Sequence, residues 1–294
     1  MRTIIQNDQR LAGQMAIFAT ALLMSTNGLF IRLLPWHPMV IAGMRSIIAA
    51  VFLLVFRMIF PPPKGVKNPP IPLWICGFLF AGTMITFVIA NTITTAANVI
   101  LLQYGAPVWA ALLGWLLIKE KPHWEQWGAL VLVIIGLLIF LRDGLGTGAL
   151  LGDGIAVFSG LLFGANSVML RKLKNGNPSD AMLLAHVICA VIGAPFIFLH
   201  PPALSTAPVL TILYMGIVSI GFGAFLFAYG IKRIPAIQAM LITVFEPLLN
   251  PVWVLLITGE RPAPAAIVGG AMILAAVIAS SVIGKRREER LRTQ

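Results

Sequence analysis

Long apolar runs follow one another along almost the whole chain, and they restrict its fold more than any other feature. A membrane-spanning helix needs about 20 mostly apolar residues, and lipid offers no water to satisfy an irregular backbone. Only short links rich in Pro, Gly and Asn separate the runs, so no soluble domain fits between them. We therefore predict an all-α membrane protein with ten transmembrane helices, approximately at 12–34, 38–59, 72–91, 95–118, 124–141, 150–171, 180–199, 208–231, 236–258 and 264–284.

Composition supports a membrane protein and excludes a soluble one. Hydrophobic residues make up 59% of the 294 residues and charged residues only 11%, whereas soluble domains contain about 25% charged residues. In a soluble protein, the net charge of +11 would suggest nucleic-acid binding. Here the basic residues form short clusters between the apolar runs instead. We therefore expect the lipid bilayer as a partner and no nucleic acid.

The basic clusters also predict an orientation in the membrane. They occupy the N-terminus, every second link and the C-terminus, whereas the other links contain only Arg32, Arg142 and Arg261. Loops rich in Lys and Arg stay in the cytoplasm, so both termini should be cytoplasmic. The predicted localisation is the cell inner (plasma) membrane, which the chain crosses many times.

Two parts of the chain repeat. Residues 107–120 match residues 247–260 in the spacing of Pro and Glu, at an offset of 140. Asn27 and Asn166, each followed five residues later by Arg, match at an offset of 139. Each half then contains five helices. Because five is odd, the second half enters the membrane from the opposite side.

An inverted repeat of this kind has a pseudo-two-fold axis in the membrane plane. Transporters with such repeats hold their substrate near the midplane, at the interface between the halves. We therefore predict two inverted five-helix units, residues 1–146 and 147–294, around a central cavity. Alternating access, in which the site opens to one side at a time, uses this symmetry directly.

The ninth run contains a carboxylate, Glu246, near its middle, and Pro247 follows it. A charged side chain in lipid is costly, so it marks a functional candidate. Asn250 and Trp253 lie within about 40° of Glu246 around a helix and extend a polar face. Glu246 could hold a substrate ammonium group or a proton. Alternatively, it could be a protonated side chain that links helices.

The first repeat has Ala106 in place of Glu246, so carboxylate chemistry would be confined to one half. The fourth helix instead presents small residues, with Ala110 and Gly114 on the same face as Ala106. Because small residues let helix backbones approach closely, we expect this face to pack against another helix.

Asn27 and Asn166 are candidates for the cavity lining because they occupy equivalent positions in the two halves. Met24 and Phe163 lie one turn before them. We expect all four to line the interface between the repeats. The alternatives are interhelical hydrogen bonds for the two amides and ordinary packing for the two apolar side chains.

The fourth and ninth helices contribute further polar candidates. Asn98 and Gln238 match at an offset of 140, near the helix starts, where solvated helix ends are the alternative. Gln103 and Tyr104 lie deeper. Either could hydrogen-bond a zwitterionic substrate, and Tyr104 could also stack on an aromatic one.

Arg45 and His186 lie inside the second and seventh runs, at nearly equivalent positions. With Glu246 they are the candidates for energy coupling, since an arginine in lipid needs a partner. The alternatives are that Arg45 snorkels to the membrane surface and that His186 is a hydrogen-bonded structural residue.

Carboxylates at helix ends have simpler interpretations. Glu120 and Glu260 each end a helix and precede x-Pro, which predicts a cap for the following helix. Asp153 and Asp180 lie at the N-terminal ends of helices, where negative charge is favourable. The eighth run is punctuated by glycines, which suits either a bending gate or a static, tightly packed helix: Gly216, Gly221, Gly223 and Gly230.

These features resemble those of the EamA-type transporters of the drug/metabolite transporter superfamily. The shared features are the Glu-Pro pair and Gly-Glu-x-Pro end of 246–262, their weaker copy at 106–122, the Gly152-Asp153 pair and the Ser25–Phe30 segment. The resemblance covers essentially the whole chain, although Lys119 replaces a glycine of the motif in the first copy. It implies a transporter. Bacterial members of the family include exporters of amino acids, among them an aromatic amino-acid exporter branch.

Motifs for other chemistry are absent from the sequence. No G-x4-G-K-[ST] loop suggests ATP hydrolysis and no His/Cys cluster suggests a metal, so we expect no ATP, no cofactor and no metal. Cys76 and Cys189 lie within apolar runs as inert side chains. The alternatives from other classes are a channel and an intramembrane enzyme that uses Glu246 or Asp153.

We therefore expect a secondary transporter, not an enzyme, that exports small metabolites by alternating access. Amino acids, including aromatic and apolar ones, are the favoured substrates, because a lining of Asn, Gln, Tyr, Trp, Met and Phe suits a net-neutral zwitterion. Export or exchange of other metabolites or drugs is the alternative. We expect a monomer or a weak dimer.

Overall fold

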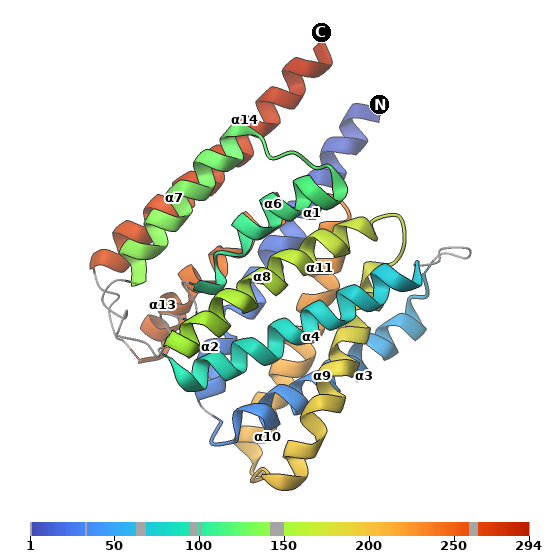
Figure 1. Cartoon of the computed structure of the whole chain (residues 1–294), viewed down its shortest axis with the longest axis vertical. Helices are drawn as coiled ribbons and strands as arrows, with labels where there is room; N and C mark the ends of the chain where they lie inside the picture. The colour runs from blue at the N-terminus through green and yellow to red at the C-terminus, as the bar shows by residue number, and fades with distance from the viewer. Residues whose placement is uncertain are drawn as a thin grey trace.

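The computed structural model of the chain describes residues 2–32, 34–62, 69–94, 99, 102–141, 150–258 and 264–293. Within these ranges all regular secondary structure is helical (Figure 1). The elements are α1 (Arg2–Met24), α2 (Asn27–Arg32), α3 (Pro38–Ile59), α4 (Pro70–Ile93), α6 (Ala106–Ile118), α7 (Trp124–Leu141), α8 (Leu150–Lys172), α9 (Pro178–Leu199), α10 (Thr206–Tyr214), the π-helix η1 (Met215–Phe222), α11 (Gly223–Ile231), α12 (Ala236–Thr243), α13 (Phe245–Thr258) and α14 (Pro264–Thr293).

The described helices follow the predicted runs, so the all-α membrane fold with ten spans is confirmed. Among the residues that the structure describes, six helical stretches are long and apolar enough to cross a membrane, and shorter apolar helices accompany them. Most of the early part of the fourth run lies outside the described residues, as do Glu260 and the boundary predicted between residues 146 and 147.

Proline marks where several helices begin. Helices α3, α4, α9 and α14 each start with proline, whose missing N–H is not needed in a first turn. The Nδ1 atom of His37 caps α3 by accepting a hydrogen bond from the backbone N–H of Met39 at 3.2 Å. Asp153 and Asp180 lie in the first turns of α8 and α9, as predicted.

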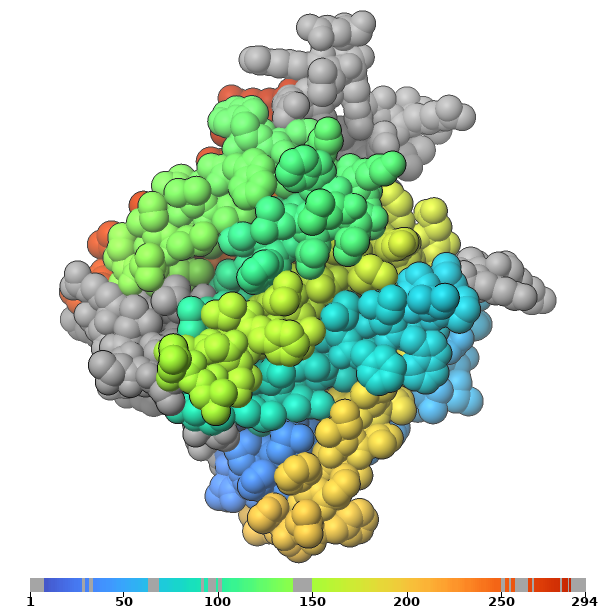
Figure 2. Space-filling view, in the orientation of Figure 1, coloured from blue at the N-terminus to red at the C-terminus, as the bar shows by residue number. Residues whose placement is uncertain are grey.

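Packing between helices repeats when the two halves are exchanged. The α4–α8 and α1–α11 contacts are equivalent under this exchange, and so are the α3–η1 and α4–α9 contacts. Two helices pack against their own equivalents, α7 with α14 and α3 with α9, and α6 of the fourth span packs against α12 of the equivalent ninth span. In Figure 1 α7 and α14 lie side by side, and Figure 2 shows α6, α8 and α4 as adjacent bands. This is the pattern of two halves related by a pseudo-two-fold axis.

The links that carry the basic clusters gather at one end of the molecule, which we call the basic face. Arg57, after the second span, and Lys232, after the eighth, border one pocket. The Lys232 ammonium also donates a hydrogen bond to the carbonyl of Gly176, after the sixth span, at 2.7 Å. Links that are far apart in sequence therefore meet as the alternation of basic clusters predicts.

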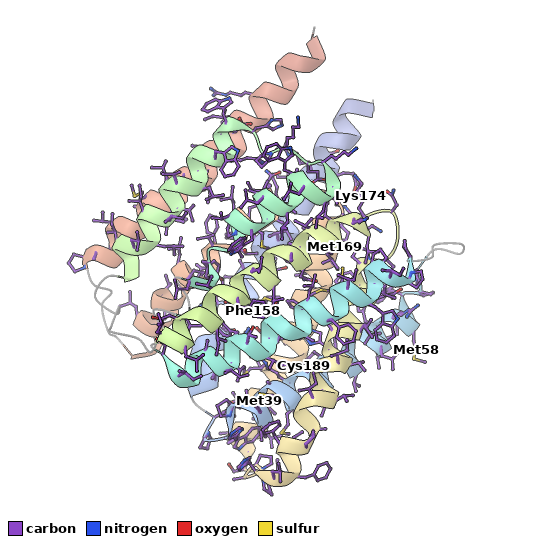
Figure 3. The ribbon with its side chains drawn as sticks, viewed as in Figure 1. Met39, Met58, Phe158, Met169, Lys174 and Cys189 are labelled. Atoms are coloured by element: carbon purple, nitrogen blue, oxygen red, sulfur yellow. The ribbon has the colours of Figure 1, made fainter. Side chains whose placement is uncertain are left out.

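The other links meet at the opposite face. The Trp36 indole, before α3, donates a hydrogen bond to the carbonyl of Ala203, after α9, at 3.2 Å. In Figure 3 Met39 and Met58 mark the two ends of α3, near the opposite face and the basic face respectively. Helix α3 therefore runs from one face to the other.

Three of the predicted spans are interrupted, which the continuous apolar runs did not predict. The first breaks between α1 and α2, where the hydroxyl groups of Ser25 and Thr26 donate to carbonyls of the preceding turn at 2.7 and 2.8 Å. The fourth has a turn at Tyr104 before α6, and the ninth breaks at Val244. Tyr104 and Val244 are 140 residues apart, so these two breaks are equivalent positions of the repeat.

Proline explains the two equivalent breaks. Pro107 and Pro247 each follow a break by three residues and cannot donate to the carbonyl of Gln103 or Thr243, respectively. Irregular backbone persists at membrane depth only where protein surrounds it or where it lines a cavity. Transporters build their substrate sites from such discontinuous helices. The breaks therefore locate the candidate site.

Small residues bring the helices of this region together. Ala106, Ala110 and Gly114 are buried on α6, which packs against α8, as predicted. A Cβ atom added to Gly164 of α8 would lie only 2.6 Å from the carbonyl oxygen of Ala106. A Cβ atom added to Gly216 of η1 would lie 2.5 Å from the Cβ atom of Ile48 on α3. Direct backbone contacts of this kind hold the interrupted spans in place.

Lys119 ends α6 in the left-handed region, with φ of 57°. The backbone N–H of Glu120 then bonds the carbonyl of Gly114 at 3.0 Å, which closes a helix end that normally uses glycine. We expect Lys119→Gly to raise the free energy of unfolding by about 1 kcal/mol, because a side chain in this conformation is strained.

Reversible unfolding in mixed micelles measures the effect of Lys119→Gly. Lys119→Ala is the matched control, since it removes the charge but keeps the Cβ atom, and it should give no gain. Equal stabilisation by the two variants would show that charge, and not backbone strain, limits stability at this position.

Candidate functional site

The two equivalent helix breaks meet inside the molecule. Helix α6 packs against α12, and the side chain of Tyr104, at the first break, is within electrostatic reach of Glu246, just after the second. Glu246 lies in the first turn of α13, where the helix dipole favours a carboxylate. The side chain is only partly exposed. Two of the predicted site residues are therefore joined at the pseudo-two-fold interface.

Arg45 and His186 complete a polar group with Glu246. The Arg45 guanidinium on α3 interacts electrostatically with Glu246 and with Cys189 of α9. His186 of α9 is in turn within electrostatic reach of Arg45. Arg45 is only 5% exposed and His186 is fully buried. The alternative that Arg45 snorkels to the membrane surface is therefore wrong.

Several buried atoms near the interface have no hydrogen-bond partner among the described residues. They are Nε of Arg45, both ring nitrogens of His186, both amide atoms of Asn166 and Oδ1 of Asn27. A buried polar atom without a partner costs free energy. The interhelical bonds considered for the two asparagines, and the structural bond considered for His186, are thus not made by these atoms in the described part of the chain. Water or a substrate could satisfy them.

Aromatic rings adjoin the buried imidazole. The ring of Phe80 lies 6.0 Å from that of His186, in an edge-on arrangement. Phe163 follows, with its ring centroid 6.5 Å from Phe80 and 6.2 Å from Phe227. These rings come from α4, α8 and α11. A site here would therefore combine a charged polar part with an apolar aromatic wall.

Other predicted residues have partners elsewhere. The Gln103 amide donates to Ser159 at 3.0 Å, and Gln238 accepts a hydrogen bond from Arg10 at 3.4 Å. The Trp253 indole donates to the Ser25 hydroxyl at 2.7 Å and so ties α13 to the break after α1. Met24 packs beside Gly223.

Asn98 and the side chain of Asn250 lie outside the described residues. Within the part of the chain that the structure does describe, no three His, Cys, Asp or Glu side chains lie close enough together to hold a metal ion.

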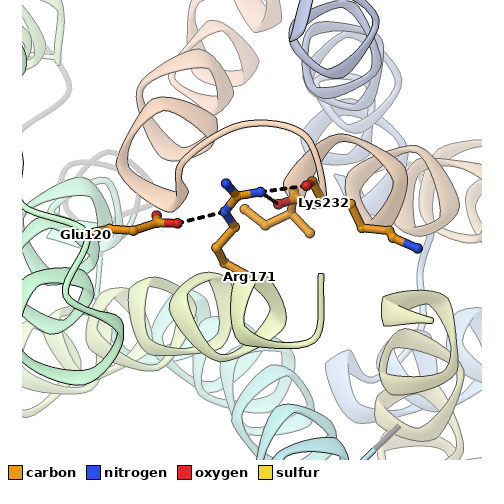
Figure 4. A network of polar contacts seen from close by, with 4 residues as sticks. Glu120, Arg171 and Lys232 are labelled. Carbon is orange, nitrogen blue, oxygen red and sulfur yellow. Dashed lines mark hydrogen bonds and ion pairs between the residues drawn. The ribbon is translucent and has the colours of Figure 1, made fainter. Parts of the chain in front are cut away.

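A polar clasp at the basic face was missed by the sequence interpretation (Figure 4). Nε of Arg171 donates to Oε1 of Glu120 at 2.9 Å, and its Nη1 donates to the carbonyls of Ile231 and Lys232 at 3.0 and 2.6 Å. The fourth, sixth and eighth spans are thereby tied together. The sequence pointed to Arg171 only through the repeat, in which Asn27 and Asn166 are each followed five residues later by an arginine.

The clasp corrects the role predicted for Glu120. Its carboxylate does not cap the next helix. The backbone N–H of His123 instead donates to Oε1 of Gln126 at 2.9 Å, which closes the first turn of α7. The physical reason is that Arg171, only 12% exposed, offers a charged partner that a backbone N–H cannot match.

We expect Arg171→Met to lower the free energy of unfolding by about 2 kcal/mol, because one carboxylate and two helix-end carbonyls lose a charged donor. Unfolding in mixed micelles measures this loss. Lys172→Gln, which removes a charge from an exposed neighbour, should change stability little. A similar loss in both variants would contradict the clasp.

Two equivalent halves, helices interrupted at their interface and a buried polar group together define an inverted-repeat membrane transporter. The chain belongs to the EamA-like transporter family, whose model matches residues 11–142 and 150–282. It is therefore a multi-pass membrane protein of a family of transporters, not of enzymes.

One relative in sequence and one solved structure are similar to this chain. The chain is 24% identical over 193 residues to "Uncharacterized transporter YwfM" of Bacillus subtilis (strain 168). That match covers 63% of this chain and 64% of the relative. The chain also shares its fold with a protein of known crystal structure, with a TM-score of 0.82 and 18% sequence identity, over 95% of this chain and 99% of the other.

Proposed function

We propose that this transporter exports amino acids, including aromatic and apolar ones, across the inner (plasma) membrane by alternating access. The observation that carries the proposal is the buried group of Arg45, His186 and Glu246 beside an aromatic wall, with several nitrogen atoms that have no hydrogen-bond partner among the described residues. A zwitterion supplies both the charges and the apolar body that such a group would bind.

Each part of the substrate has a counterpart. A carboxylate would pair with Arg45 and hydrogen-bond His186, because both present unpartnered buried nitrogen atoms. An ammonium group would approach Glu246, which lies within electrostatic reach of Tyr104 and Arg45. An apolar side chain would lie against Phe163 and its neighbouring rings. A net-neutral ligand adds no charge to the membrane interior, which favours a zwitterion over a free anion.

Alternating access is supported by the two-fold packing of the halves. The basic face would lie in the cytoplasm, and the units 1–146 and 147–294 would rock about the central site. No ATP, cofactor or nucleic acid enters this mechanism, and a single chain contains the whole site. Membership of the aromatic amino-acid exporter branch remains part of this proposal.

Transport into proteoliposomes tests the substrate class. We expect saturable uptake of L-phenylalanine and L-leucine above the background of empty vesicles, with exchange against substrate loaded on the other side. Screening each amino acid with and without an imposed pH gradient also tests energy coupling. Uptake no faster than in empty vesicles would overturn the proposed substrate, and non-saturable flux would indicate a channel.

Glu246→Gln tests whether the carboxylate carries a proton. If it does, transport by the variant should lose its dependence on an imposed pH gradient, while exchange of substrate persists. Initial rates at several pH values measure this. Asp8→Asn removes an exposed carboxylate near the N-terminus and serves as the control. Rates and pH dependence like those of the wild type would remove Glu246 from the mechanism.

A further inference from the structure

A separate pocket of about 150 Å³ opens at the basic face, between α3, α9 and α11. Three charged side chains line it, Arg57, Asp180 and Lys232. Aromatic rings line it as well, those of Phe56, Phe60 and Phe225. In Figure 3 Met58 and Lys174 mark the neighbouring ends of α3 and α8. The pocket therefore combines both charge signs with an apolar surface, at the end of the molecule where an exporter would load.

The charged groups are placed so that a ligand can reach them. Nε of Arg57 lies 3.3 Å from Oδ1 of Asp180, and the Arg57 side chain is 46% exposed. The Asp180 side chain is 16% exposed, and its Oδ1 atom also accepts a hydrogen bond from Nδ2 of Asn177 at 3.0 Å. A salt bridge with one exposed member contributes little stability by itself. A zwitterion can therefore exchange its own two charges for those of Arg57 and Asp180.

Lys232 supplies a second cation. Burial, together with the neighbouring Arg233, lowers the pKa of its ammonium group. Within the pocket this group donates a hydrogen bond to the carbonyl of Gly176 at 2.7 Å. A neutral carbonyl compensates a partly desolvated ammonium less well than an anion does. Lys232 and Arg57 together thus favour a carboxylate.

The aromatic rings form a continuous surface beside these charges. The centroid of the Phe56 ring lies 4.5 Å from that of Phe225 and 4.8 Å from that of Phe60. Leu53 and Leu183 close the inner end of the apolar lining. Such a surface suits a small apolar or aromatic side chain.

At the two-fold equivalent position on the opposite face, aromatic and imidazole rings stack on one another. There the ring of His37 stacks between Phe196 and His200, with ring centroids 5.6 and 4.5 Å away. Phe196 and His200 are the equivalents of Phe56 and Phe60 at an offset of 140. The rings that line the pocket at the basic face are therefore arranged differently from their equivalents on the opposite face.

We propose that this pocket is a loading site, which binds an amino-acid zwitterion with an apolar side chain before it reaches the central group. Its carboxylate pairs with Lys232 and Arg57, its ammonium group pairs with Asp180, and its side chain lies on the phenylalanine rings. The proposal rests on the proposed export of amino acids and extends it to a second site.

Transport measured from each face tests the loading site. Membrane vesicles of opposite orientation present either the basic face or the opposite face to L-phenylalanine. We expect Lys232→Gln and Asp180→Asn each to raise KM from the basic face at least fivefold. The maximal rate from the basic face and KM from the opposite face should stay near the wild-type values. The maximal rate from the opposite face should fall by the same factor, because release toward the basic face is slowed and a variant cannot change the equilibrium across the membrane. Lys174→Gln, an exposed residue on the same face, should change neither KM.

Two competitors that each lack one charge sharpen the test. Phenethylamine has no carboxylate, so its inhibition from the basic face should weaken in Asp180→Asn but not in Lys232→Gln. 3-Phenylpropionate has no ammonium group, so its inhibition from the basic face should weaken in Lys232→Gln but not in Asp180→Asn. This cross-pattern separates ligand contacts from a general loss of fold, because a misfolded variant would lose both competitors and transport from both faces.

Each other outcome overturns a definite statement. Transport of phenylalanine with unchanged KM in both variants would remove the loading site and leave the proposed function intact. A wild-type protein that transports no amino acid would remove the proposed function, and the loading site with it. If the effect of Lys232→Gln requires phosphatidylglycerol and disappears in phosphatidylcholine vesicles, the pocket binds a lipid headgroup and is not a loading site.

Discussion

The hydrocarbon core of the bilayer offers no hydrogen-bond partners, and this constraint shapes the whole structure. Each polar group inside the bilayer must find a partner in the protein or in a cavity. The breaks at Tyr104 and Val244 satisfy the constraint because α6, α8 and α12 enclose them, with small residues such as Gly164 in direct backbone contact. The same enclosure brings the side chains of Tyr104 and Glu246 together.

Close packing and polar function depend on each other here. Glycine contacts such as those of Gly216 with α3 hold the backbone rigidly around Arg45. A rigid surround prevents the buried polar atoms from turning toward each other, so they stay available to a ligand. At the basic face, Arg171 provides the complementary restraint by tying three spans at their ends. The centre therefore keeps polar atoms without partners among the described residues, while Arg171 fixes the ends of the spans.

Periodicity and repeat were enough to predict the spans, the two-fold relation and the small-residue face of Ala106. The helix breaks could not be predicted, because apolar runs continue through them and because proline in a membrane helix permits either a kink or a break. The ion pair of Glu120 and Arg171 escaped because it joins distant links, while the local pattern around Glu120 resembles a cap. The burial of Arg45 depends on the crossing of α3 and α9, which sequence spacing does not contain.

The crossing of α3 and α9 bears on how a protein built from two similar halves comes to favour one of its two orientations. The backbones of Gly43 and Gly193 touch near the opposite face, whereas their two-fold equivalents, Leu183 and Leu53, stand at the open pocket. Identical halves would make the two orientations equal in free energy, so neither face would be preferred at rest. Divergence in side-chain volume at these four positions breaks that degeneracy. The resting orientation can therefore change without substitutions in the central group of Arg45, His186 and Glu246.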